Sequence, residues 1–198
     1  MMQAHISPPT VPASTLILIR DYHGQLQTYL LKRSAKSKFM ANLHVFPGGR
    51  LEPSDHEKAV WREHGDLDKR QFSRRIAEPM ALAEAAAYAL AAIRECLEEA
   101  GVFLANTADR SAGDIDRIIR QAQSPDRTPN WFVETIRRES WVLELSALLR
   151  WSHWITPQQM ARRFDTRFFI AAMPPGQTCR PDEHEAVDGI WIDPRRAL

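Results

Sequence analysis

Three glutamates lie close together in the segment Arg94–Gly101, which reads RECLEEAG. Glu95, Glu98 and Glu99 are spaced i, i+3 and i+4, so on a helix their carboxylates share one face. Like charges at this spacing repel, and a helix tolerates them on a solvated face or where a hard cation neutralises them. Carboxylate oxygens suit Mg²⁺ or Mn²⁺. The acids alone therefore leave two interpretations, a solvated helix face or a metal site.

A long helix and a glycine turn must position these acids. Residues 81–100 are rich in Ala and other helix formers, and Gly101 after them is typical of a helix C-terminus. Upstream, Val45-Phe46 predicts a strand that stops at the turn Pro47-Gly48-Gly49. Two glycines would let the backbone pass close to a bound group, although a plain turn is the alternative.

The order of these residues resembles the signature of the Nudix hydrolases, G-x5-E-x7-R-E-U-x-E-E-x-G-U, where U is aliphatic. The second half is matched by Arg94, Glu95, Cys96, Glu98, Glu99, Gly101 and Val102. The first half is matched by Gly49 and, six residues later, by Asp55 in place of Glu. Residues 56–93 stand where the signature has only seven positions, so we expect an insertion, at 56–79. One branch of the Nudix coenzyme A diphosphatases carries a long insert here, and the chain resembles that branch.

A second motif, upstream of the first, also resembles the coenzyme A branch. The segment YLLKRS at Tyr29–Ser34 is followed, at the spacing of that branch, by Lys38, Asn42 and FPGG. Lys38 replaces an Arg, which keeps the charge but loses the bidentate fork. Asn42 replaces a Gly, and Asn still tolerates positive φ.

The same segment concentrates positive charge. Lys32, Arg33, Lys36 and Lys38 place four cations within seven positions. Coenzyme A carries a 3′-phosphate as well as a diphosphate, so a local basic cluster suits its recognition. Arg33 is the strongest candidate because it falls on the Arg of the motif, whereas a solvated basic loop is the alternative.

The resemblance implies a role for each matched residue. Glu95, Glu98 and Glu99 would hold Mg²⁺ or Mn²⁺, and Arg94 would orient Glu95 through a salt bridge rather than touch the substrate. The residues expected to bind the substrate are Arg33, Ser34, Lys38, Gly48 and Gly49. Those expected to be catalytic are Glu98, Glu99, Arg94 and Glu185.

The general base is expected outside the signature. Glu185 stands six residues before Trp191, a place where related sequences keep an acid, and it is the first candidate for base or metal ligand. Glu183 and His184 are the next candidates. A solvated acidic turn explains the cluster almost as well.

The remaining pattern predicts an α+β fold, which the resemblance makes a Nudix α/β/α sandwich with a mixed sheet. Residues 14–198 would form one domain, 1–13 a flexible or extended lead-in, and 56–79 a mostly exposed insertion. The expected strands are 15–20 and 27–33, which form a hairpin, and 102–104, 148–155, 168–172 and 189–192; further helices are expected at 112–123 and 130–140. Trp151, Trp154 and Trp191 fall in these strands, and we expect them in the core or at its edge.

The composition of the chain limits which partners and which cellular location are expected. Lys and Arg number 26 against 25 Asp and Glu, a net charge of +1, so no global basic field indicates nucleic acid or membrane partners. The chain shows no membrane-length apolar run and no signal-peptide pattern, so we expect a cytoplasmic protein. Cys96 and Cys179 are too few for a disulfide framework.

The function implied by the resemblance is metal-dependent hydrolysis of the diphosphate of coenzyme A or acyl-CoA to 3′,5′-ADP and (acyl-)4′-phosphopantetheine. One alternative is a Nudix diphosphatase for a dinucleotide or nucleotide sugar. Another is a non-catalytic nucleotide-binding module. The intact Arg94, Glu95, Glu98 and Glu99 argue against a pure binder, which has no reason to keep mutually repelling acids.

Overall fold

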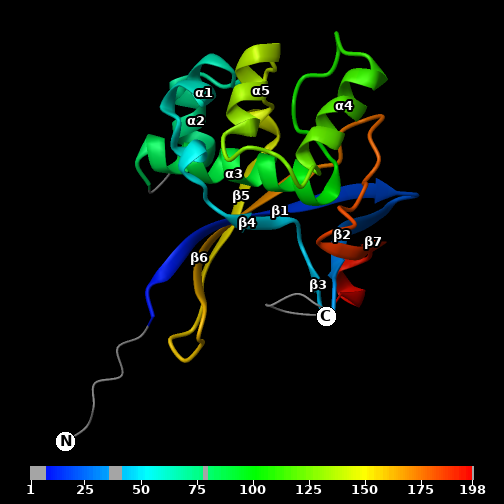
Figure 1. The fold of residues 1–198 in the computed structure, drawn as a ribbon. Coiled ribbons are helices and arrows are strands. Elements are labelled where there is room, and N and C mark those ends of the chain that lie inside the picture. Colours follow the sequence, from blue (N-terminus) through cyan, green and yellow to red (C-terminus); the bar gives the residue numbers. More distant parts are fainter. Residues whose placement is uncertain (1–7, 36–41, 78–79, 198) are drawn as a thin grey trace, which may run out of the picture.

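The computed structural model describes residues 8–35, 42–77 and 80–197. They form one mixed sheet with helices packed on it (Figure 1). The strands are β1 (Thr10–Tyr22), β2 (Gln25–Arg33), β3 (His44–Val45), β4 (Gly48–Arg50), β5 (Leu149–Ile155), β6 (Arg163–Ala172) and β7 (Ala186–Ile192). The α-helices are α1 (Lys58–Glu63), α2 (Lys69–Phe72), α3 (Leu82–Ala100), α4 (Ala112–Ala122) and α5 (Trp131–Glu139). Shorter helical turns are η1 (Pro53–His56), η2 (Ser73–Ala77), η3 (Leu145–Ala147) and η4 (Pro194–Arg196).

Strand β1 lies at the centre of the sheet. It pairs antiparallel with β2 and β4 and parallel with β6, while β3 and β7 flank β2 and β5 flanks β6. The hairpin of β1 and β2 is confirmed, and its turn residues His23 and Gly24 both have positive φ, as tight hairpin turns require. The α+β class with a mixed sheet is therefore confirmed. Because β1 begins at Thr10, residues 10–13 belong to the sheet rather than to a lead-in.

Helix α3 occupies the interior. In Figure 1 it lies between strands β1 and β4 on one side and the other α-helices on the other. Every residue from Ala85 to Ala100 is buried, and the many alanines let neighbouring elements approach it closely. Gly101 ends the helix in the left-handed conformation, with φ of 63°, as predicted. The interpretation of its acids as a solvated helix face is wrong.

The insertion is mostly exposed over residues 56–76, as expected, but a few of its apolar side chains belong to the core. Val60, Trp61, Phe72 and Ile76 are at most 2% exposed, and the rings of Trp61 and Phe72 stack at 4.8 Å. These residues lie in α1, α2 and η2, elements too short to show a hydrophobic period in the sequence. They cover α3, which explains why α3 has no solvated side.

Most of the remaining expectations for secondary structure are confirmed. Helices at 112–123 and 130–140 appear as α4 and α5. The strand expected at 148–155 appears as β5, one residue shorter, and those at 168–172 and 189–192 lie within β6 and β7. Within the described residues, no helix combines the length and the apolar character needed to cross a membrane.

Two local expectations are wrong. Residues 102–104 are buried but form no strand, because the side-chain amide of Gln177 bonds both the N–H and the carbonyl of Phe103. Gly48 and Gly49 belong to strand β4, paired with β1 at Thr15 and Ser14, rather than to a turn that ends a strand.

Two of the three strand tryptophans are not core residues. Trp151 and Trp154 are 66% and 62% exposed, because they lie on β5 at the end of the strand order, where all seven residues of the strand are exposed. Trp191 is half-buried and packs against the core beside Tyr29, with ring centres 5.3 Å apart. The pattern of apolar residues could not distinguish an edge strand from a covered one.

Candidate active site

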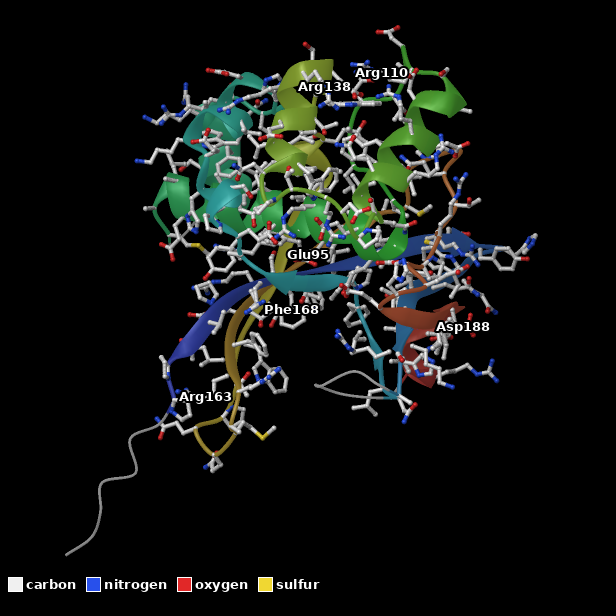
Figure 2. The ribbon with its side chains drawn as sticks, viewed as in Figure 1. Glu95, Arg110, Arg138, Arg163, Phe168 and Asp188 are labelled. Carbon is white, nitrogen blue, oxygen red and sulfur yellow. The ribbon has the colours of Figure 1, made fainter. Side chains whose placement is uncertain are left out.

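Strand β4 and helix α3 meet at the predicted glycines. The backbone N–H of Gly48 donates to Oε2 of Glu99 at 2.8 Å. A Cβ added to Gly49 would lie 2.6 Å from the carboxyl carbon and Oε2 of Glu95, so any larger residue would displace this carboxylate. Figure 2 shows Glu95 where the helical layer meets the strands. The structure therefore brings the glycine pair and two of the predicted acids together.

Arg94 organises the acids from inside the protein. It is 1% exposed and donates from Nη1 to Glu95 at 2.9 Å and to Glu98 at 3.2 Å. Its Nε and Nη2 donate to the two carboxylate oxygens of Asp55, and Nη2 also donates to the carbonyl of Arg50. The contact with Glu95 is the one the resemblance implies, and Asp55 completes the arrangement from the other half of the signature.

Glu98 shares Arg94 with Glu95 and also contacts a part of the chain outside the signature. Its Oε1 accepts a hydrogen bond from Nε1 of Trp131 at 2.9 Å, and its Oε2 accepts from Arg94 and from Nη2 of Arg127, both at 3.2 Å. Trp131 and Arg127 lie on or just before α5, more than twenty-five residues from Glu98. Sequence reasoning missed both, since no local motif marks a contact made only in the folded chain.

Glu185 reaches the site through the loop before β7. The backbone N–H groups of Arg180 and Asp182 donate to the carbonyls of Ala100 and Glu99, which fixes this loop against the end of α3. The Glu185 carboxyl interacts with that of Glu99, although Glu185 is exposed like the alternatives Glu183 and His184. The loop thus brings Glu185 to the predicted acids.

The electrostatics of the cluster favour a cation. Burial raises the pKa of Glu95 to about 8, against the opposing charge of Arg94. Burial, and then the charges of Glu95 and Glu185, raise the pKa of Glu99 well above its usual range. Burial also raises the pKa of Glu98. A bound cation would offset the cost of holding these carboxylates ionised away from water.

The donor set fits a divalent ion by its chemistry. Carboxylate oxygens are the ligands that Mg²⁺ and Mn²⁺ prefer. In the described ranges, no three His, Cys, Asp or Glu side chains already converge as a coordination shell. Glu95, Glu98 and Glu99 are therefore candidates by charge, burial and proximity rather than by finished geometry.

The predicted substrate residues lie at the end of β2. Lys32 and Arg33 pair with β7, and the backbone N–H of Ser34 donates to the carbonyl of Glu185 at 3.4 Å. Nε of Arg33 is buried and has no hydrogen-bond partner among the described residues. Asn42 adopts φ of 61°, the positive φ that Asn was expected to tolerate. Lys36 and Lys38 lie outside the described residues.

Comparison with known proteins places the chain in a family. A family model described as the NUDT19 Nudix domain matches residues 7–198. The chain is 28% identical over 206 residues to the acyl-coenzyme A diphosphatase NUDT19 of Xenopus laevis, covering 87% of this chain and 54% of that protein. It is 29% identical over 201 residues to the Homo sapiens protein of the same name, covering 85% and 53%. The chain thus spans about half the length of the curated relatives it matches.

A solved structure confirms the fold. A NUDIX hydrolase from Alicyclobacillus acidocaldarius superposes with a TM-score of 0.73 at 22% identity, covering 95% of this chain and 81% of that chain. The match of residues 7–198 to the family model includes both halves of the signature and the insertion between them. The chain belongs to the NUDT19 Nudix domain family.

Proposed function

We propose that this chain hydrolyses the diphosphate bond of coenzyme A or an acyl-CoA, giving 3′,5′-ADP and (acyl-)4′-phosphopantetheine. The names of the relatives, acyl-coenzyme A diphosphatase, support this substrate class. The observation that carries the proposal is the gathering of Glu95 and Glu99 against the backbone of Gly48 and Gly49, with Glu185 beside Glu99. Buried negative charge beside a close-approach backbone is what a cation-assisted phosphate site needs.

The acids are proposed to hold Mg²⁺ or Mn²⁺. Glu95 and Glu99 face the glycine pair, and Glu98, which shares Nη1 of Arg94 with Glu95, is the third proposed ligand. The ion would neutralise charge on the phosphoryl oxygens and lower the pKa of the attacking water.

The remaining side chains are proposed to position the ligands and move the proton. Arg94 holds Glu95 by its ion pair and, being buried, has no access to substrate. Glu185 is exposed and adjacent to Glu99, so it is the proposed general base that accepts the proton of the attacking water. The proposed catalytic domain is residues 14–198, with 56–79 inserted, and strand β1 extends it to residue 10.

Substrate binding is proposed for Arg33, Ser34, Lys38, Gly48 and Gly49. The buried, unpartnered Nε of Arg33 is a donor that a phosphate could satisfy, because buried polar groups otherwise find partners. The backbone link from Ser34 to Glu185 joins this segment to the proposed base.

A panel of diphosphates with Mg²⁺ or Mn²⁺ tests the proposal. Coenzyme A, an acyl-CoA, a dinucleotide and a nucleotide sugar are compared by kcat/KM, and products are identified by mass spectrometry. We expect 3′,5′-ADP from coenzyme A or acyl-CoA at the highest kcat/KM. Glu99→Gln should lose this activity, and Glu63→Gln, at an exposed acid of α1, should keep it. Faster hydrolysis of the dinucleotide or sugar would contradict the substrate class, and binding without turnover would contradict catalysis.

A further inference from the structure

The carboxylate of Glu98 is held from outside the Nudix signature. Nε1 of Trp131 donates to Oε1 at 2.9 Å, while Arg94 and Arg127 donate to Oε2, both at 3.2 Å. Glu98 and Trp131 are 6% and 3% exposed, so this contact is made away from water. Both carboxylate oxygens are therefore fixed, one by a neutral donor and one by two cations.

The position of Trp131 is itself fixed. It is the first residue of α5, and its ring packs edge-on against Phe132 with centres 5.6 Å apart. Just before it, the carbonyl of Pro129 accepts a hydrogen bond from Oγ of Ser54, next to Asp55. The indole is thus tied to the same region of the fold that anchors Arg94.

A fixed indole N–H restricts how Glu98 can turn. A carboxylate on a flexible side chain can point either oxygen toward a cation or away from it, and a hydrogen bond to one oxygen selects an orientation. Trp131 is a neutral donor, so it orients the Glu98 carboxylate without forming an ion pair that competes with a bound cation. Arg127, which is charged, does form such a pair. Donors that orient metal-binding carboxylates contribute strongly to metal affinity.

We propose that Trp131 is a positioning residue for Glu98, and that it presents this carboxylate to the divalent ion. This inference rests on the metal site of the proposed function. Trp131 touches neither substrate nor reacting atoms, and it acts through the orientation of Glu98 alone.

The test compares two tryptophan replacements. Trp131→Phe removes the N–H together with part of a buried ring. Trp61→Phe is the matched control, because Trp61 is 2% exposed, stacks on Phe72, and its Nε1 has no hydrogen-bond partner among the described residues. Both variants lose the same volume, and only Trp131→Phe loses a hydrogen bond.

The readout is Mn²⁺ binding, followed by electron paramagnetic resonance of the free ion without substrate. We expect Trp131→Phe to raise the Kd about 10-fold and Trp61→Phe to leave it within about twofold of the wild type. In a Glu98→Gln background, Trp131→Phe should have no further effect. Equal Kd values for the two Phe variants, or an undiminished effect in the Glu98→Gln background, would overturn the inference.

A second measurement leaves Trp131 unsubstituted, so it does not depend on whether the Trp131→Phe variant folds. Indole ¹⁵N–¹H resonances are followed during a Mg²⁺ titration, and the Trp131 resonance is assigned as the one moved by Glu98→Gln. It should shift saturably with Mg²⁺ while that of Trp61 stays in place, and a Trp131 resonance that ignores Mg²⁺ would refute the positioning role. Because both titrations need no substrate, a wrong substrate class leaves them unaffected, whereas a wild type that binds no ion contradicts the inference and the proposed metal site together.

Discussion

Arg94 donates to both carboxylate oxygens of Asp55, from Nε at 3.0 Å and from Nη2 at 2.8 Å, and each residue is 1% exposed. Asp55 directly precedes the insertion, and Arg94 lies on α3 beyond it. The pair therefore holds the two halves of the interrupted signature together. A long insertion is compatible with the site because a buried ion pair joins the chain before the insertion to helix α3 after it.

Breaking this pair should be costly. Asp55→Asn leaves the buried Arg94 partly unpaired, and we expect a loss of about 3–5 kcal/mol in the free energy of unfolding. Glu57→Gln is the control, since its pair with Arg137 is exposed and should be worth at most about 1 kcal/mol. Urea denaturation measures both, and comparable losses in the two variants would show that the buried pair has no special structural role.

Neutralising the acids of α3 should abolish turnover. We expect Glu98→Gln and Glu99→Gln each to lower kcat by at least about 100-fold with the fold retained, because each removes a proposed metal ligand. Both side chains are buried rather than exposed, so circular dichroism must confirm folding of each variant. A two- or threefold loss at saturating Mg²⁺ would contradict the metal assignment.

The stability of the metal-free protein should fall as pH rises. The pKa of Glu95 is about 8 when folded, above the ordinary value near 4.5, so the folded state retains its proton more strongly. That stability is fully present below about pH 4.5 and is lost as pH rises through about 8. We expect Tm in EDTA to decrease from pH 5 to pH 8.5, and Mg²⁺ to raise Tm most at the alkaline end. A Tm that rises across this range would contradict the prediction.

Removing the insertion should unfold the protein. Replacing 56–79 with a short Gly/Ser linker would delete Trp61 and Phe72 and uncover α3. The milder Trp61→Ala should cost about 3–5 kcal/mol. Thermal unfolding followed by circular dichroism checks both, and a cooperatively folded deletion variant would show that the insertion is dispensable.

The 3′-phosphate of coenzyme A should be recognised through Arg33. We expect kcat/KM for coenzyme A to exceed that for 3′-dephospho-coenzyme A by about 10- to 100-fold, the value of one charge-assisted hydrogen bond. Arg33→Ala should remove most of this preference and should change kcat/KM for 3′-dephospho-coenzyme A little. Arg137→Ala, at an exposed pair on α5, is the control. Equal rates of the unmutated protein on both substrates would exclude this recognition.

The sequence was most informative where a local rule decides the structure. Gly101 ends α3 because glycine readily adopts positive φ, and the spacing of Glu95 and Glu99 places both on one helix face. Tertiary contacts lay beyond such rules. Trp131 meets Glu98 from 33 residues away, and Gln177 replaces the strand partner that 102–104 was expected to have. The contribution of the insertion to the core was missed because Trp61 and Phe72 lie on helices too short to show a period.

The uneven burial of the tryptophans divides the intrinsic fluorescence of the chain into two populations. Trp151 and Trp154 stand open to solvent on β5, whereas Trp61, Trp131 and Trp141 are at most 3% exposed. An ionic quencher such as iodide can collide with the first two indoles and not with the last three. The emission it leaves unquenched comes largely from the interior, and Trp131, which bonds Glu98, contributes to that protected emission.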